Sequence, residues 1–287
     1  MGGAIASFLL ERGWDVVGLS RTSSREKSLA KCILADIGKV GLVENISDKL
    51  SPCDAIVHAA ASMDMGLYTS SISLTNCLGT QQILELANFW RSTNLVYISS
   101  VPVIGTPKQL PITEDHPTNP PTAYHASKLF GENLIQIAAR NGLAGTILRL
   151  TSPVGIRMPE NRILSVFVKR ALADEPLQIV GNGTRKQNYV DVRDISDVIE
   201  KCLQQCVSGV FNIAGEHSIS NKGLADICIR TLGSSSKIEF TGQPDPEDGM
   251  AWEVSIAKAK KCLGYDPRYS IEDSISAIGA EYAARYH

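Results

Sequence analysis

The stretch Leu95-Val96-Tyr97-Ile98-Ser99-Ser100 gives the first indication of the fold. An apolar run of this length that ends in small polar residues is typical of a buried parallel strand. Comparable runs occur at 54–61 and 145–150, and helical patterns separate them over roughly 70–90 and from Tyr124 onward. Strands that alternate with helices predict an α/β fold with a doubly wound parallel sheet.

The same alternation continues toward both ends of the chain. A helical pattern at 4–12 ends at Gly13, and strands are predicted at 14–19, 32–36 and 210–213. After Pro153 the rhythm loosens, which predicts a second, smaller lobe. We therefore expect a nucleotide-binding domain and a substrate-binding lobe, with the domain formed by residues 1–153 and 187–214 and the lobe by 154–186 and 215–287.

Composition places the chain among ordinary cytoplasmic proteins. Its 287 residues are 44% hydrophobic and 20% charged, with a formal net charge of -2. This balance gives no electrostatic signature of a nucleic-acid or membrane partner, and no apolar run reaches the roughly 18 residues that span a bilayer. We see no signal peptide. Seven scattered cysteines without a CxxC motif predict reduced, buried thiols rather than a metal site or a disulfide framework.

The first stretch that predicts a catalytic function is Tyr124-His125-Ala126-Ser127-Lys128. Residues four apart lie one turn apart on the same face of a helix. The ammonium of Lys128 can therefore favour the ionised form of the Tyr124 phenol, whose ordinary pKa is ~10. We expect Tyr124 to act as an acid or a base near neutral pH. The YxxxK spacing alone is weak, because both residues are common on helix surfaces.

Three further motifs surround this pair in a fixed order: His58-Ala59-Ala60-Ala61 after a strand, Asn76-Cys77-Leu78-Gly79-Thr80 in the next helix, and Ser99-Ser100 with Gly105 at a strand end. Together they resemble the extended short-chain dehydrogenases/reductases of the NAD-dependent epimerase/dehydratase family, over nearly the whole chain. The resemblance implies a Rossmann-type sheet, a nicotinamide cofactor and a homodimer formed through the helices at 70–90 and 122–141.

The resemblance also implies three catalytic residues. Tyr124 would exchange a proton with the substrate, and Lys128 would hold the nicotinamide ribose and lower the pKa of the tyrosine. Ser100 would hold the substrate oxygen, with Ser99 as the alternative. Dehydratases of the family carry an Asp-Glu pair just after this serine, where this chain has Val101 and Pro102. The replacement argues against dehydration.

The implied cofactor-binding residues extend from the N-terminus to the fifth predicted strand. They are Gly2, Ser20, Arg21, Asp36, Ile37, Ala59, Ala60, Ala61, Asn76, Tyr124, Lys128 and Thr151. Ser20 stands where an acid would bind the ribose of NAD, and Arg21 follows it. A hydroxyl and a guanidinium suit a 2′-phosphate, so we expect NADP, with NAD as the second choice. Arg21 as a solvated loop residue is the alternative.

Implied substrate-binding residues are Ser100, Ser152, Arg185 and Gln187. Gln187 occupies the place of a diphosphate-binding arginine, which Arg185 could supply by a two-residue shift. A second arginine of the family is absent, and Glu247, Asp248 and Trp252 stand in that region. Because a diphosphate needs fixed donors, this loss weakens a nucleotide-sugar assignment. The resemblance therefore implies an oxidoreductase or epimerase acting at a secondary alcohol or ketone, with sugar and non-sugar substrates both open.

The N-terminus departs from the family pattern. In a Rossmann unit a strand and a Gly-rich turn precede the first helix, and that helix holds the pyrophosphate. Here Met1 and Gly2 lead directly into the helix, and Gly2 matches the last glycine of such a turn. We expect a truncated start, a gap in the core and no pyrophosphate cradle. The alternative function is that of a non-catalytic or cofactor-deficient binding protein.

Overall fold

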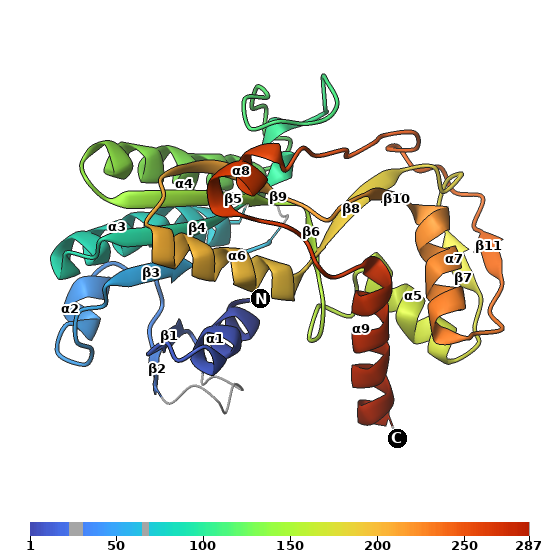
Figure 1. Cartoon of the computed structure of the whole chain (residues 1–287), viewed down its shortest axis with the longest axis horizontal. Coiled ribbons are helices and arrows are strands. Elements are labelled where there is room, and N and C mark those ends of the chain that lie inside the picture. Colours follow the sequence, from blue (N-terminus) through green and yellow to red (C-terminus); the bar gives the residue numbers. More distant parts are fainter. Residues whose placement is uncertain (23–30, 65–68, 287) are drawn as a thin grey trace.

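The structure is a computed structural model that describes residues 1–22, 31–64 and 69–286. Its larger half is built on a parallel sheet with the strand order β3-β4-β5-β9 (Figure 1). The strands are β3 (Ala55–His58), β4 (Asn94–Ser100), β5 (Ala144–Leu150) and β9 (Gly209–Ile213). All of their pairings are parallel, so the predicted α/β fold with a parallel sheet is confirmed.

Helices cover both faces of this sheet. One face carries α2 (Leu42–Ile46), the π-helical turn η1 (Ser73–Leu78), α3 (Gly79–Trp90) and α4 (Ala123–Arg140). The other carries α1 (Gly2–Glu11), α6 (Val192–Gln205) and α8 (Ala257–Leu263). The short 3-10 helix η2 (Val101–Ile104) follows β4 directly.

Alternation along β4 explains why both faces are covered. Val96 and Ile98 pack into the core with α1 and α6, whereas Leu95 and Tyr97 pack into the opposite core with α3. Successive side chains of a strand point to opposite faces, so a continuous apolar run requires helices on both sides. The buried run at 95–98 therefore predicted the layered architecture.

A separate two-stranded sheet lies beside the main one. In it β1 (Val17–Ser20) pairs in parallel with β2 (Lys31–Leu34), and neither strand pairs with β3 in the described ranges. Yet Val17 and Leu19 share a core with Ile56 of β3. The hydrogen-bonded sheet is thus interrupted between β1 and β3 inside shared cores. The sequence of the N-terminus predicts a gap in the core at this place, whereas the described ranges show two strands, not paired with each other, whose side chains still share a core.

The second half of the molecule has its own core. Helices α5 (Ile163–Leu172), α7 (Asn221–Leu232) and α9 (Ile271–Tyr286) pack together there. Strand β8 (Lys186–Asp191) pairs with β6 (Ser152–Val154) and β10 (Ser218–Ser220), and β7 (Leu177–Ile179) pairs with β11 (Ile238–Phe240). Figure 1 shows this half beside the main sheet, joined to it by β6 and β8.

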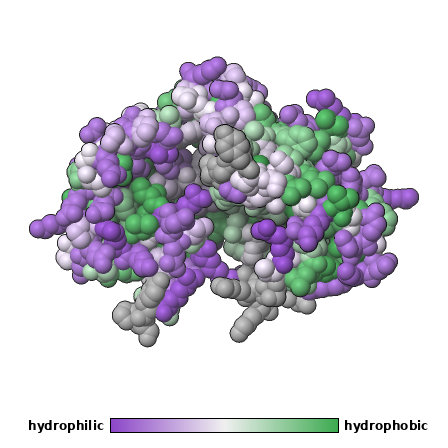
Figure 2. Space-filling model, turned by 180° about the vertical axis from the view of Figure 1, so that it is seen from behind, coloured by the Kyte–Doolittle hydropathy of each residue, from purple (hydrophilic) through white to green (hydrophobic). Residues whose placement is uncertain are grey.

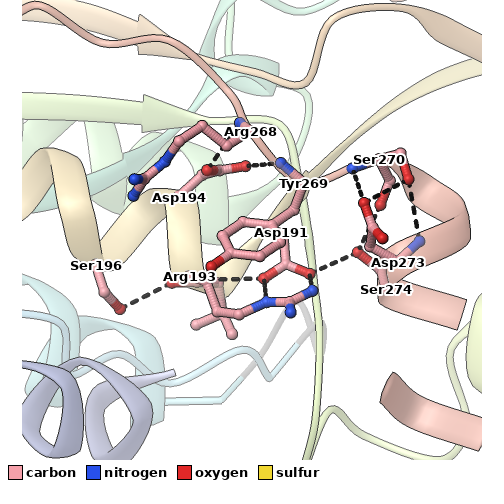
Figure 3. Close-up of polar contacts among 10 residues, drawn as sticks. Asp191, Arg193, Asp194, Ser196, Arg268, Tyr269, Ser270, Asp273 and Ser274 are labelled. Atoms are coloured by element: carbon pink, nitrogen blue, oxygen red, sulfur yellow. Dashed lines mark hydrogen bonds and ion pairs between the residues drawn. The ribbon is translucent and has the colours of Figure 1, made fainter. Parts of the chain in front are cut away.

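A polar network fastens the start of α6 to the C-terminal segment (Figure 3). Asp191 caps α6 by accepting the N–H of Arg193 at 2.8 Å, and it also accepts the hydroxyl of Ser274 in α9 at 2.6 Å. Asp194 accepts the backbone N–H groups of Arg268 and Tyr269 at 3.0 and 3.2 Å. These bonds hold the two halves of the molecule in one arrangement.

Two further properties bear on the sequence analysis. None of the helices in the described ranges has the length and apolarity required to cross a membrane.

All seven cysteines are free, but only Cys202 and Cys228 are buried, while Cys206 and Cys262 are exposed. The other three are partly buried, so the prediction of buried thiols is confirmed for two cysteines and is wrong for Cys206 and Cys262.

Candidate active site

Helix α4 places Tyr124 and Lys128 one turn apart near its start. Thr122 caps the helix by accepting the N–H of His125 at 3.3 Å. Lys128 is only 3% exposed, and its Nζ donates to the carbonyl of Ile98 on β4 at 2.9 Å. That Nζ lies 4.8 Å from the ring centre of Tyr97 and 6.0 Å from that of Tyr124. The ammonium therefore lies between the helix and the strand end.

Burial dominates the electrostatics of the pair. It lowers the pKa of Lys128 to about 8, against the opposing charge of Glu132. It raises the pKa of Tyr124, and the charge of Arg162 partly offsets this rise. The sequence predicted a lowered tyrosine pKa caused by Lys128, and that prediction is wrong for this structure. Desolvation disfavours the phenolate, so burial by itself favours the neutral phenol of Tyr124.

The two serines at the end of β4 have different surroundings. Ser99 is buried, and its hydroxyl donates to Glu132. Ser100 is partly exposed, and among the described residues its hydroxyl has no hydrogen-bond partner. Neighbouring strand residues face opposite sides, which leaves only Ser100 free to meet a ligand. The assignment of Ser100 stays a prediction that this arrangement favours over Ser99.

Sequence reasoning missed a buried ion pair directly behind the site. Glu132, which is fully buried one turn after Lys128, accepts Nε and Nη2 of Arg149 at 3.0 and 2.8 Å. Arg149 also donates to the carbonyl of Glu114 at 3.2 Å. The available signals were an arginine inside the apolar strand β5 and a second polar residue on the buried face of α4. The pair locks α4 onto β4 and β5.

Asn76 is held by the protein on both sides of its amide. Its Oδ1 accepts the N–H of Ser62 at 2.7 Å, and its Nδ2 donates to the hydroxyl of Ser127 at 2.9 Å. Nearby, His58 Nε2 lies 3.0 Å from the Thr80 hydroxyl. Burial and the charge of Lys128 lower the pKa of His58 to about 3, so this imidazole is neutral. Asn76 thus joins the turn after β3 to α4.

The residues predicted to hold the adenosine end of a cofactor lie on β1, β2 and the turns after them. Ser20 accepts the N–H of Thr22 at 3.4 Å, and Asp36 accepts the N–H of Gly38 at 3.0 Å. Arg21 is exposed and Ile37 is buried. At the start of α1, a Cβ added to Gly2 would meet no atom within 4 Å. The backbone of this helix start is therefore accessible.

The strand ends bring the predicted alanines to the edge of the sheet. Ala59 and Ala61 are partly exposed and Ala60 is exposed, directly after β3. Thr151, after β5, donates its hydroxyl to Asn188 at 2.9 Å. Carboxyl ends of parallel strands are where α/β sheets bind ligands. Small side chains at this edge leave space for a flat cofactor, and Lys128 offers it a donor.

On the lobe side, the predicted substrate-binding residues form one chain of contacts. Ser152 Oγ lies 3.4 Å from the amide of Gln187, and with that amide turned the Gln187 oxygen accepts Arg185 Nε at 3.1 Å. Arg185 also forms an ion pair with Glu247. The guanidinium expected to replace the missing diphosphate-binding arginine is thus neutralised by a carboxylate 62 residues away.

A pocket of about 270 Å³ opens in the lobe. It is lined by Asn161, Ile163, Val166, Phe167, Gln178, Ile179, Val180 and Asn221. Asn221 is 7% exposed, and its Oδ1 has no hydrogen-bond partner in the part of the chain that the structure describes. A buried carbonyl oxygen without a partner is unusual and suits a ligand that donates a hydrogen bond. The pocket is mostly apolar with amide groups at its edge, which suits a planar polar ring.

Comparisons with known proteins agree with this geometry. The model of the "NAD dependent epimerase/dehydratase family" matches residues 1–214. A UDP-glucose 4-epimerase from Lactobacillus helveticus is 28% identical, over 94% of this chain and 89% of its own. A dTDP-glucose 4,6-dehydratase from Streptomyces griseus is 27% identical, over 80% of this chain and 71% of its own.

Solved structures share the fold. The UDP-glucose 4-epimerase of Thermotoga maritima, crystallised with UDP-glucose, superposes with a TM-score of 0.89. The alignment covers 100% of this chain and 96% of that one, at 22% sequence identity. A UDP-glucuronic acid 4-epimerase from Bacillus cereus, crystallised with NAD, gives a TM-score of 0.83 at 23% identity. The Rossmann-type sheet with a C-terminal lobe is therefore confirmed.

Proposed function

The chain belongs to the NAD dependent epimerase/dehydratase family, and from this premise we propose that it is an NAD-dependent epimerase of nucleotide sugars. The observation that carries the proposal is the grouping of Tyr124, Lys128 and the unpartnered Ser100 hydroxyl at the edge of the sheet. Relatives named as epimerases and dehydratases supply the substrate class. The comparisons show the family, and the proposal selects one reaction of that family, the epimerisation of a nucleotide sugar.

Epimerisation is favoured over dehydration by the residues after Ser100. Val101 is 1% exposed and packs in an apolar cluster with Val103 and Ile104, and Pro102 lies in the same 3-10 helix. Neither Val101 nor Pro102 can donate or remove a proton. Elimination of water needs an acid and a base at the substrate, so this segment supports a reaction without elimination.

The residues around Tyr124 and Lys128 fit the nicotinamide end of a dinucleotide cofactor. Lys128 and Tyr124 would hold the ribose, and the small residues after β3 would lie against the cofactor. The family match and the NAD-bound neighbours support NAD, and they give no support to the expected NADP. Bound NAD would supply the hydride acceptor for oxidation of the sugar alcohol to a ketone and, once reduced, the hydride donor for reduction of that ketone on its other face.

The side chains of this chain would handle the proton. Tyr124 would accept the proton of the sugar hydroxyl as a phenolate and return it as a phenol once the carbon has inverted. Because burial raises the pKa of Tyr124, the phenolate requires positive charge nearby. Lys128 and Arg162 are the cations placed to provide it. The Ser100 hydroxyl would donate to the substrate oxygen while its charge changes.

A homodimer through α3 and α4 is part of the proposal. Phe89 on α3 is 56% exposed, and Phe130 and Ile137 on α4 are 41% and 53% exposed. Figure 2 shows apolar surface gathered over the half of the molecule that carries these helices. Contiguous apolar surface of this kind is typical of an interface.

The direct test uses fluorescence titration with NADH and NADPH, followed by an assay that interconverts UDP-glucose and UDP-galactose. NADH should bind more tightly than NADPH, and the assay should show interconversion. Absence of binding by either nucleotide would contradict the enzyme proposal. Tighter binding of NADPH would restore the reading of Ser20 and Arg21 as a 2′-phosphate site.

The interrupted sheet favours a second candidate. In the described ranges β1 and β3 are not hydrogen-bonded to each other, so the sheet is interrupted on the side where the adenosine end of a cofactor would bind. A cofactor-deficient binding protein would use the lobe pocket without turnover. This second candidate predicts that the protein binds a nucleotide sugar but does not bind NADH. The titrations with NADH and NADPH therefore distinguish it from the enzyme.

A further inference from the structure

Arg162 occupies a position that the sequence analysis did not single out. It is the residue before α5, and its neighbours Asn161 and Ile163 both line the lobe pocket. Its side chain extends toward the other half of the molecule, where Nη2 lies 3.9 Å from the sulfur of Met63. Arg162 therefore lies between two pocket-lining residues in the chain, and its guanidinium reaches across to the larger half.

Met63 connects this contact to the catalytic helix. The preceding residue, Ser62, bonds to Asn76, and Asn76 bonds to Ser127, the neighbour of Lys128. A chain of short contacts thus runs from Arg162 to α4. The charge of Arg162 also lowers the pKa of Tyr124, which agrees with this placement. The contact with Met63 therefore places the guanidinium on the side of the larger half that carries Asn76 and the start of α4.

The other arginines on this side are engaged. Arg185 is paired with Glu247, and Arg149 is buried against Glu132. Arg170 donates to the carbonyl of Pro176 at 2.8 Å. Arg162, by contrast, contacts no carboxylate among the described residues and is exposed. Its charge is thus available to a ligand.

We propose that Arg162 binds the diphosphate of the substrate. It would take over the role of the family's diphosphate-binding arginine, whose place in this sequence is occupied by Gln187. The inference rests on the proposed nucleotide-sugar function. With the sugar at Tyr124 and the base in the pocket beside the unpartnered oxygen of Asn221, the diphosphate lies in between, at Arg162. A planar guanidinium donates two parallel hydrogen bonds to phosphate oxygens. The first N–H groups of α5 add donors on the same side, because no side chain caps them.

The test compares UDP with uridine by titration calorimetry. Arg162→Gln should weaken UDP binding by about 10- to 100-fold, the usual loss for a charge-assisted pair, and leave uridine binding unchanged. Arg162→Lys should lie between, because an ammonium cannot bind bidentately. Arg140→Gln is the matched control: it removes the same charge at the far end of α4, roughly 24 Å along the helix from Tyr124, and should bind UDP like the wild type.

Each contrary result has its own meaning. Equal UDP affinity in the wild type and in Arg162→Gln would overturn the inference and leave the epimerase proposal intact. A loss in Arg185→Gln with no loss in Arg162→Gln would assign the diphosphate to Arg185 instead. Equal losses of UDP and uridine in Arg162→Gln would also overturn it, because they would reveal damage to the pocket. A wild-type chain that binds neither compound would overturn both proposals.

Discussion

Replacing Glu132 by Gln should destabilise the protein more than any change in a surface ion pair. The carboxylate accepts Nε and Nη2 of Arg149, at 3.0 and 2.8 Å, and the hydroxyl of Ser99. Its side chain is 0% exposed, and that of Arg149 is 6% exposed. Glutamine keeps the shape but leaves a buried guanidinium without a counter-charge. Breaking a buried pair in this way costs about 3–5 kcal/mol, and the remaining amide oxygen favours the lower figure.

Urea unfolding followed by tryptophan fluorescence measures this change. Glu160→Gln is the control, because Glu160 pairs with Lys169 and with Arg285, each at 3.7 Å, on a surface where all three side chains are about half exposed. Each of these pairs should contribute less than about 1 kcal/mol. The double replacement Glu132→Leu with Arg149→Met should recover most of the loss, because it removes both charges together.

Two results would refute the reasoning. A loss below about 1 kcal/mol in Glu132→Gln would mean that water or another group satisfies Arg149, so that the pair does not hold α4 against β5. A double replacement less stable than Glu132→Gln would mean that side-chain shape, and not charge pairing, determines the stability of this region.

Three further predictions concern catalysis, pH and assembly. Tyr124→Phe should lower kcat by about 10²- to 10⁴-fold while NADH affinity changes little; retained turnover would remove Tyr124 from the mechanism. The pKa of buried His58 is lowered from 6.5 to about 3, so its stabilising contribution is present above pH 6.5 and is lost as the pH falls toward 3. His58→Asn should therefore lose about 2–3 kcal/mol less than the wild type in urea unfolding between pH 7 and pH 4.5, and equal pH dependence would contradict this. Ile137→Glu should convert a dimer into a monomer in light scattering, whereas a monomeric wild type would contradict the proposed interface.

Local patterns predicted much of the fold and part of the site. The apolar run at 95–98 implied a strand covered on both faces, and the spacing of Tyr124 and Lys128 placed both on one turn of a helix. Within the described ranges β1 and β3 do not pair, but the family model matches from residue 1 and gives no support to a truncated start. The inferences about individual strands and helices succeeded because strand alternation and helix periodicity depend on residues close together in the chain.

Long-range packing determined the rest. The pairing of Glu132 with Arg149 depends on α4 lying against β5, and that of Arg185 with Glu247 on how the lobe closes. The raised pKa of Tyr124 reflects burial, which no spacing of residues reports. The sequence by itself determined the strand-and-helix order and the placement of Tyr124 and Lys128 one turn apart on a helix. Only the tertiary structure decided which arginine is free to meet an anion, because a charge is neutralised by neighbours in space rather than in sequence.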